Sequence, residues 1–140
     1  MANMVAIGLV VAQFDKTGEI IPAMESAGKD AAADAGAEIR TIHRVPGSYD
    51  TPLAADRLAR RDDIDAVAAI GAIITGETDH DRVIANAAAN GLTTVSLERD
   101  TPVTLGIIGP GMTAGQARDR VHYGGVAVNS AIELAKEFEG

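Results

Sequence analysis

Four short segments carry aromatic or polar residues at points where the sequence predicts that a strand ends. They are Gln13-Phe14-Asp15, residues 45–50 (VPGSYD), residues 75–80 (TGETDH) and residues 109–113 (GPGMT). The carboxyl ends of parallel strands meet at one edge of a sheet, and open α/β sheets bind their ligands there. We therefore expect the four segments to converge on one ligand site.

Each candidate residue in these segments has a functional and a structural interpretation. An aromatic ring at Phe14 would stack on a planar ligand, or it would close the rim of the core. Ser48 and Asp50 would bind ligand hydroxyls, or they would cap a helix. Gly76 precedes a predicted helix start, and His80 falls in the first turn of that helix. Its imidazole would transfer protons near pH 7 beside a phosphate bound at the helix start, or it would be a solvated surface histidine.

Other site chemistries find little support in the sequence. Arg120 would clamp a phosphate through two hydrogen bonds, although its neighbours Arg118 and Asp119 also fit a solvated charged face. Asp79, His80 and Asp81 are adjacent, so they point in different directions on a helix, and we predict no metal site. No segment matches the phosphate-binding loop of nucleotide hydrolases or the GxGxxG dinucleotide pattern, and we predict no cofactor.

Composition narrows the partners and the compartment. The 140 residues contain 20 Asp and Glu, 12 Lys and Arg, and no Cys, for a net charge of −8. Such a charge disfavours nucleic acid and anionic membranes as partners. The absence of Cys gives no sign of an oxidising compartment, so we expect a cytoplasmic protein. The apolar run near the N-terminus lacks a basic leader and ends at Phe14-Asp15, which predicts a first strand. The acidic surface indicates either adaptation to high salt or an ordinary acidic enzyme.

The hydrophobic pattern alternates between short β-rich runs and longer helical stretches. We predict strands over residues 5–12, 37–45, 65–74 and 102–108, and helices over residues 17–35, 49–61, about 78–100 and 113–138. Asn90-Gly91 would break or end the third helix, Gly109-Pro110-Gly111 would make a sharp turn, and Gly124-Gly125 would loosen the last helix. Strands alternating with helices predict one domain, residues 1–140, with a parallel four-stranded sheet covered on both faces. The low aromatic content of 3% leaves a small core, which oligomerisation would supplement.

Taken together and in order, several motifs resemble the 6,7-dimethyl-8-ribityllumazine synthase family, especially its archaeal form. They are VAQFD, VPGSYDTPLA, AIGAIITGETDHD, PVTLGIIGPGMT and the QARDRVHYG stretch. The resemblance spans nearly the whole chain and implies a flavodoxin-like three-layer αβα sandwich. It also implies condensation of 5-amino-6-(D-ribitylamino)uracil with 3,4-dihydroxy-2-butanone 4-phosphate, releasing phosphate and water, in riboflavin biosynthesis. The family uses no metal and no organic cofactor.

The resemblance also assigns roles to individual residues. Phe14 would stack on the pyrimidine, the turn Gly47, Ser48, Tyr49 and Asp50 would hold the ribityl chain, and the backbone of Ala72, Ile73 and Ile74 would read the pyrimidine edge. Gly76, Glu77 and Thr78 would cradle the phosphate, His80 would move protons, and Arg120 would bind phosphate from the neighbouring subunit. The family forms pentamers, some of them assembled into 60-subunit shells, with sites at subunit interfaces, and riboflavin synthase is a candidate partner.

Three positions depart from many relatives. Asp15 follows the stacking Phe where Asn is usual, Asp50 replaces Glu in the ribityl turn, and Leu105 replaces Phe in the fourth strand. Asp50 is one methylene shorter, so its contact with the ribityl hydroxyls would be longer or mediated by water. Leu105 leaves less aromatic surface over the pyrimidine.

Three other functions are compatible with parts of the pattern. One is an archaeal riboflavin synthase, which exchanges a four-carbon unit between two lumazines. The second is a non-catalytic shell protein that binds flavin or lumazine, and the third is a flavodoxin-like nucleotide binder. GETDHD and PVTLG favour lumazine synthase over the first, and the presence of both His80 and Arg120 favours it over the second.

Overall fold

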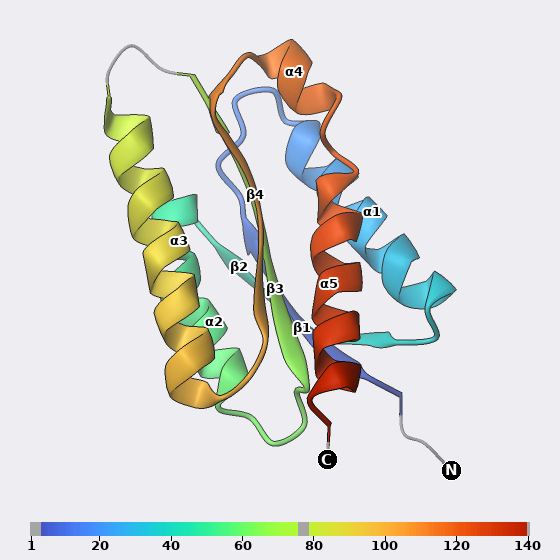
Figure 1. Ribbon diagram of the computed structural model, residues 1–140. Helices are drawn as coiled ribbons and strands as arrows, with labels where there is room; N and C mark the ends of the chain where they lie inside the picture. The colour runs from blue at the N-terminus through green and yellow to red at the C-terminus, as the bar shows by residue number, and fades with distance from the viewer. Residues whose placement is uncertain (1–3, 76–78, 140) are drawn as a thin grey trace.

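A computed structural model describes residues 4–75 and 79–139, which form a sheet covered by helices on both faces (Figure 1). In chain order the elements are β1 (Ala6–Ala12), α1 (Ile20–Asp34), β2 (Glu38–Val45), the short 3-10 helix η1 (Ser48–Asp50), α2 (Thr51–Ala59), β3 (Ala66–Ile74), α3 (His80–Arg99), β4 (Val103–Met112), α4 (Ala114–Arg118) and α5 (Tyr123–Glu137).

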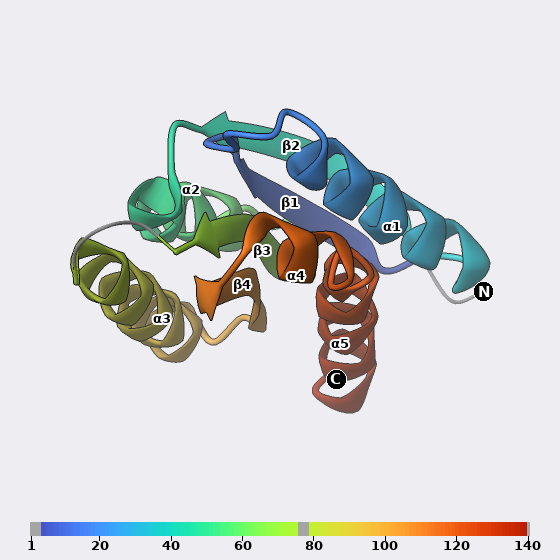
Figure 2. The same cartoon turned by 90° about the horizontal axis from the view of Figure 1, so that it is seen from above.

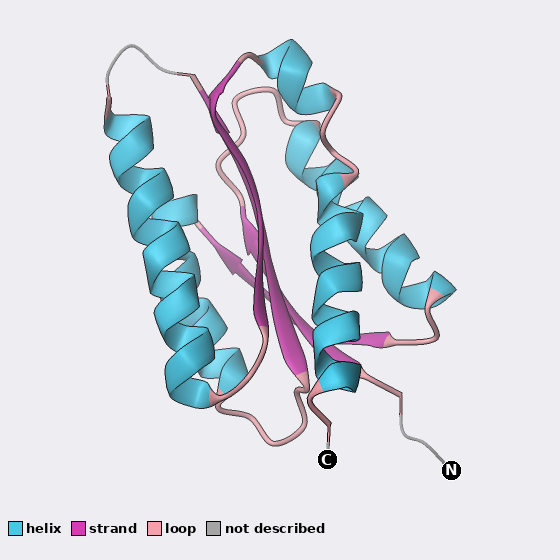
Figure 3. Ribbon diagram, viewed as in Figure 1, coloured by secondary structure: helices cyan, strands magenta, loops and turns pink. Residues whose placement is uncertain are grey.

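The sheet has the strand order β2-β1-β3-β4, and each neighbouring pair is parallel. Strands and helices alternate along the chain (Figure 3). Seen from above, α1 and α5 cover one face of the sheet, and α2 and α3 cover the other (Figure 2). The predicted flavodoxin-like α/β fold with a four-stranded parallel sheet is therefore confirmed.

The two central strands explain why the sequence favours this arrangement. β1 and β3 are near-continuous apolar runs, and every residue of β1 is buried. A strand that is covered on both faces requires such a run, because neither side of its pleat meets water. The edge strands β2 and β4 contain exposed residues among their apolar ones.

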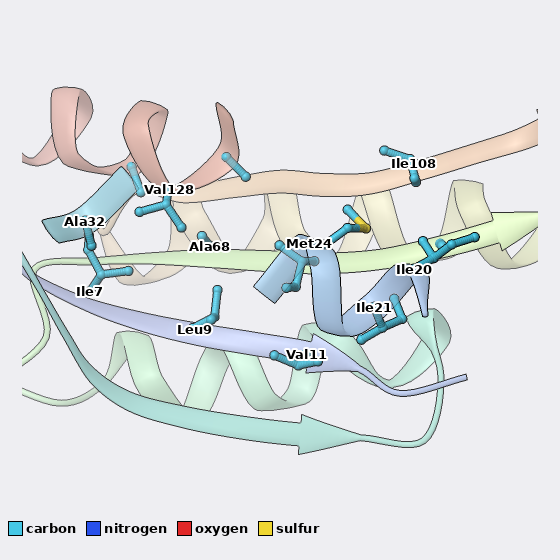
Figure 4. Packing of buried hydrophobic residues seen from close by; sticks show 14 of the residues in the cluster. Ile7, Leu9, Val11, Ile20, Ile21, Met24, Ala32, Ala68, Ile108 and Val128 are labelled. Atoms are coloured by element: carbon cyan, nitrogen blue, oxygen red, sulfur yellow. The ribbon is translucent and has the colours of Figure 1, made fainter. Parts of the chain in front are cut away.

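The larger core lies between the sheet and the pair α1 and α5 (Figure 4). Fully buried side chains there include Leu9 of β1, Ile70 of β3, Met24 of α1 and Val128 of α5. A smaller core lies on the other face, where Leu58 of α2 and Leu92 of α3 pack against the sheet. Together the two cores hold the carboxyl ends of the strands at one edge.

The predicted interruption of the third helix at Asn90-Gly91 is wrong. α3 is continuous from His80 to Arg99. A Cβ atom built on Gly91 would lie 2.6 Å from Cγ of Pro52 in α2, so the missing side chain is what allows the two helices to approach closely. Gly91 is a packing residue, and tertiary contact outweighs its weak helix propensity.

The predicted end of the fourth strand at residue 108 is also wrong. β4 continues through Gly109-Pro110-Gly111 to Met112, and its register with β3 shifts between Ala72 and Ile74. The main-chain N–H of Thr75 donates to the carbonyl of Met112 at 2.8 Å, so the two strands stay paired beyond the irregularity. Gly109 has a φ of 89°, which an L-residue with a side chain rarely adopts.

The predicted single terminal helix over residues 113–138 is in fact two helices, α4 and α5. The chain leaves α4 after Arg118 and enters α5 at Tyr123, ahead of the glycine pair. Gly124 and Gly125 lie inside α5, where a Cβ on Gly124 would lie 2.1 Å from the carbonyl oxygen of Met24 in α1. The glycine pair therefore allows α5 to pack closely against α1, and α5 continues through it without a break.

A buried carboxylate ties α1 to the edge strand β2. Glu25 of α1 is 8% exposed and accepts two hydrogen bonds from the guanidinium of Arg44 in β2. The ammonium of Lys29 lies 2.8 Å from the same carboxylate. The Arg44 hydrogen bonds, with those of Lys29, outweigh burial and lower the pKa of Glu25 from 4.5 to about 2.

We expect this cluster to make stability depend on acid. Since folding lowers the pKa of Glu25, its contribution is fully present above about pH 4.5 and is lost as the pH falls toward about 2. Arg44 and Lys29 are half exposed, so solvent screening limits the contribution to about 1–2 kcal/mol. Urea unfolding of wild type and Glu25→Gln, at one protein concentration and at pH 7 and about pH 3, measures it.

The Glu25→Gln protein should be less stable than wild type at pH 7, and the difference should shrink at about pH 3. Exposed Glu133 on α5 supplies the matched control, because Glu133→Gln removes a carboxylate outside the cluster. A difference between wild type and Glu25→Gln that is equal at both pH values would contradict the assignment.

Candidate active site at the carboxyl edge of the sheet

Three of the four predicted segments surround one cavity of about 370 Å³ at the carboxyl edge of the sheet. We call it the Phe14 cavity. The residues that line it come from the loop after β1, from the turn after β2, from the end of β3 and from the start of α3. They are Phe14, Asp15, Lys16, Gly47, Ser48, Tyr49, Ala72, Ile73, Ile74, His80, Asp81 and Ile84.

Phe14 stands on the cavity wall and does not close the core. Its side chain is 63% exposed. Its backbone is fixed by the turn after β2, because the N–H of Phe14 donates to the carbonyl of Pro46 at 2.9 Å and that of Gln13 donates to the carbonyl of Val45 at 2.8 Å. The structure therefore offers an aromatic face on a rigid strand end, as stacking on a planar ring requires.

Asp15 organises the loop that carries Phe14. One carboxylate oxygen accepts hydrogen bonds from the N–H and the hydroxyl of Thr17, and the other accepts from the N–H groups of Ile20 and Ile21 at the start of α1. Partial burial raises the pKa of Asp15, but these hydrogen bonds together lower it below its usual value. The charged carboxylate thus caps α1 and closes the loop beside the cavity.

The turn at residues 47–50 is held by its own polar groups. The carboxylate of Asp50 accepts from the N–H of Gly47 at 3.0 Å, and the hydroxyl of Thr51 donates to the carbonyl of Ser48 at 2.8 Å. Ser48 is 7% exposed, whereas Tyr49 is 64% exposed on the cavity wall. Asp50 is not among the residues that line the cavity, and its carboxylate stabilises the turn through the hydrogen bond from Gly47.

The end of β3 and the first turns of α3 complete the cavity. Ala72, Ile73 and Ile74 contribute an apolar surface with main-chain groups at the strand end. His80 is the first residue of α3, where the positive end of the helix dipole favours an anion. The predicted phosphate cradle of Gly76, Glu77 and Thr78 lies outside the described residues.

Two predicted site residues lie away from this cavity in the same chain. Arg120 follows α4 and donates a hydrogen bond to the carbonyl of Gln116 at 2.9 Å. Leu105 lies in the middle of the edge strand β4, opposite Ala69, and is 55% exposed. The fold does not bring either residue to the Phe14 cavity of its own chain.

Three residues that line the cavity were not predicted from the sequence. Lys16 and Asp81 each follow a predicted residue directly. Lysine and aspartate are common on protein surfaces, so their residue types did not mark them as part of a site. Ile84 follows His80 by four residues, and helical spacing places residues i and i+4 on the same face, so this position could have been found.

A second cavity of about 480 Å³ lies beside α1 and β2. Its charged lining includes Glu25, Lys29 and Arg44, which bind one another, and Asp15, which caps α1. These groups are used in holding the fold, so the Phe14 cavity is the better candidate for substrate chemistry.

Two further searches concern the described part of the chain. No group of three or more His, Asp or Glu side chains there could hold a metal ion. No helix within residues 4–75 and 79–139 has the length and hydropathy required to cross a membrane.

The structure is that of a flavodoxin-like α/β protein, and its candidate site lies where open α/β sheets bind small ligands. Residues 4–139 match the family model of 6,7-dimethyl-8-ribityllumazine synthase. The chain therefore belongs to the 6,7-dimethyl-8-ribityllumazine synthase family.

Individual proteins support the same assignment. A 6,7-dimethyl-8-ribityllumazine synthase from Halobacterium salinarum is 60% identical over 96% of this chain and 100% of the relative. Relatives with the same name come from Methanosarcina barkeri, 45% identical over 96% of this chain and 98% of the relative, and Methanocaldococcus jannaschii, 42% identical over 99% and 97%. The family, the enzyme class and the role in riboflavin biosynthesis that the motifs implied are confirmed.

Proposed function

We propose that the Phe14 cavity is where 5-amino-6-(D-ribitylamino)uracil condenses with 3,4-dihydroxy-2-butanone 4-phosphate. The observation that carries this proposal is that Phe14, Tyr49 and His80, which come from three separate loops, line one cavity of about 370 Å³. A stacking ring, a polar turn and a proton carrier are the groups that this pair of substrates requires.

The ribitylaminouracil binds across the turn and the strand ends in this proposal. Its pyrimidine stacks on Phe14, and its edge hydrogen-bonds with the main chain of Ala72, Ile73 and Ile74. The ribityl chain lies along Gly47, Ser48 and Tyr49. Asp50 acts indirectly, because its carboxylate holds the N–H of Gly47 and thereby the shape of the turn.

The butanone phosphate binds beside the start of α3. Gly76, Glu77 and Thr78 hold its phosphate, and His80 serves the reacting carbons. The substrate amine attacks the ketone and loses one water to form an imine, phosphate leaves by elimination, and the ring closes with loss of a second water. Each step moves a proton, and the imidazole of His80 can both accept and donate one.

We further propose that each site is completed by a second copy of the chain. Arg120 and Leu105 are away from their own cavity, on the segment after α4 and on an edge strand, and both are available to a neighbour. A homopentamer, or twelve pentamers in a 60-subunit shell, supplies Arg120 to the phosphate and Leu105 to the pyrimidine. Riboflavin synthase is the proposed partner of the assembly.

The acidic surface supports a cytoplasmic protein adapted to high salt, as in a halophilic archaeon. The net charge is −8, and relatives at 60% and 56% identity come from Halobacterium salinarum and Halorubrum lacusprofundi. Concentrated ions screen the repulsion among surface carboxylates, so the assembly should gain stability and activity in molar KCl.

One experiment tests the reaction and the salt dependence together. Purified protein in low and in molar KCl is mixed with both substrates, and lumazine fluorescence and phosphate release are followed. We expect both products in equal amounts above the uncatalysed background, with higher activity in molar KCl. If the folded protein forms neither lumazine nor phosphate at either salt concentration, the proposed reaction is contradicted. Turnover of lumazine as the only substrate would identify a riboflavin synthase instead.

A further inference from the structure

Gly71, near the carboxyl end of β3, lies directly beneath the turn after β2. A Cβ atom built on Gly71 would lie 2.8 Å from the hydroxyl oxygen of Ser48 and 3.1 Å from Cβ of Ala12. Real Cβ atoms essentially never approach another atom within 3.0 Å. The Ser48 hydroxyl therefore occupies space that any residue other than glycine at position 71 would need.

We propose that Gly71 is a positioning residue, because its lack of a side chain leaves the Ser48 hydroxyl the room that it occupies in the turn lining the Phe14 cavity. This inference rests on the proposed function, in which Ser48 belongs to the turn that holds the ribityl chain. Gly71 does not have a positive φ, so backbone strain does not explain the glycine. The glycine is explained instead by the Ser48 hydroxyl, which occupies the space that a side chain at position 71 would need.

The turn that carries Ser48 is held against the core. Ser48 is 7% exposed, and its carbonyl accepts a hydrogen bond from Thr51, which is completely buried. The turn is therefore anchored from below. A methyl group at position 71 would either rotate the Ser48 hydroxyl away or lift the turn, and each change moves the ribityl-binding groups relative to Phe14.

A double-mutant cycle between positions 71 and 48 tests this inference. We expect Gly71→Ala to lower kcat/KM for the ribitylaminouracil about 10- to 100-fold, because small displacements in a site that aligns two reactants carry penalties of this size. The loss should appear mainly as a higher KM for the ribitylaminouracil, with the KM for the butanone phosphate unchanged. In a Ser48→Ala background the same substitution should cost less than about 3-fold, because the hydroxyl that it displaces is gone.

Gly8→Ala is the matched control, since Gly8 lies on β1 and a Cβ there would meet Leu58 of α2 at 3.0 Å. Gly8→Ala should alter stability equally in the wild-type and Ser48→Ala backgrounds and should leave both KM values unchanged. If Gly71→Ala is recovered only as aggregate, recovery of folded protein when it is combined with Ser48→Ala supports the proposal, and continued aggregation overturns it.

The possible outcomes distinguish failure of the proposed reaction from failure of the positioning role of Gly71. Inactive wild-type protein overturns the proposed function and this inference with it. Active wild-type protein with equal effects of Gly71→Ala in both backgrounds overturns the positioning role of Gly71 alone.

Discussion

Replacing His80 by alanine should slow the condensation about 100-fold without abolishing it, since a positioned acid–base group contributes at least about that factor. His80 opens α3 and lines the Phe14 cavity. The residual rate should remain well above the uncatalysed reaction, because holding the two substrates in register supplies about 7–11 kcal/mol in favourable cases. Steady-state kinetics of lumazine formation, with both substrates varied, measures the change.

The loss should fall mainly on kcat, because the proposed contacts to the pyrimidine and the ribityl chain come from other residues. His43→Ala is a suitable control, since His43 is half-buried in β2 and is not one of the residues that line the cavity. Unchanged kcat in His80→Ala would remove His80 from the mechanism. Complete loss of turnover with intact substrate binding would show instead that His80 is an irreplaceable proton carrier.

The sequence predicts the four strands and their alternation with helices well, because a buried strand appears in the sequence as a continuous apolar run. β1 and β3 are apolar runs of the length that a strand covered on both faces requires. The strand-end rule then indicates Phe14, Ser48, Tyr49 and His80 without any structure, because parallel strands deliver their carboxyl ends to one edge. Those four residues line one cavity.

The wrong predictions at Gly91 and Gly124 share one physical cause, which is that a glycine is compatible both with a chain break and with a close approach of a neighbouring segment. Gly91 and Gly124 are placed inside helices because Pro52 and the Met24 carbonyl pass where a side chain would stand. The identity of the approaching neighbour is a tertiary fact, so local pattern cannot distinguish the two uses. Gly71 belongs to the same class, and its neighbour is a residue of the proposed site.

Asp15 and Asp50 show a second limit of sequence reasoning. Both stand in segments that the sequence assigns to substrate contact, yet the carboxylate of Asp15 is occupied by the start of α1 and that of Asp50 by the N–H of Gly47. A carboxylate beside a predicted helix start is compatible with capping and with ligand binding. Only the folded structure identifies which N–H groups it accepts from.

Co-assembly of the His80→Ala and Arg120→Ala proteins should restore part of the activity if each site is shared by two neighbouring subunits. His80→Ala lacks the proton carrier, and Arg120→Ala should chiefly raise the KM for the butanone phosphate, so both should be slow at low concentrations of that substrate. In random co-assemblies of equal amounts, about a quarter of the sites combine His80 of one chain with Arg120 of another. Dissociating the two proteins together and reassembling them should therefore give about a quarter of wild-type activity.

The placement of Arg120 makes this test decisive. Arg120 follows α4, its guanidinium donates to the carbonyl of Gln116 within that helix, and it is not among the residues that line the Phe14 cavity of its own chain. If one chain supplied both groups, reassembly would give only the average of the two slow parents, since no chain in the mixture carries both. The same two proteins mixed without dissociation are the control, because intact assemblies keep their original neighbours. Activity that appears only after reassembly, and that falls on dilution to subunits, would require an intersubunit site.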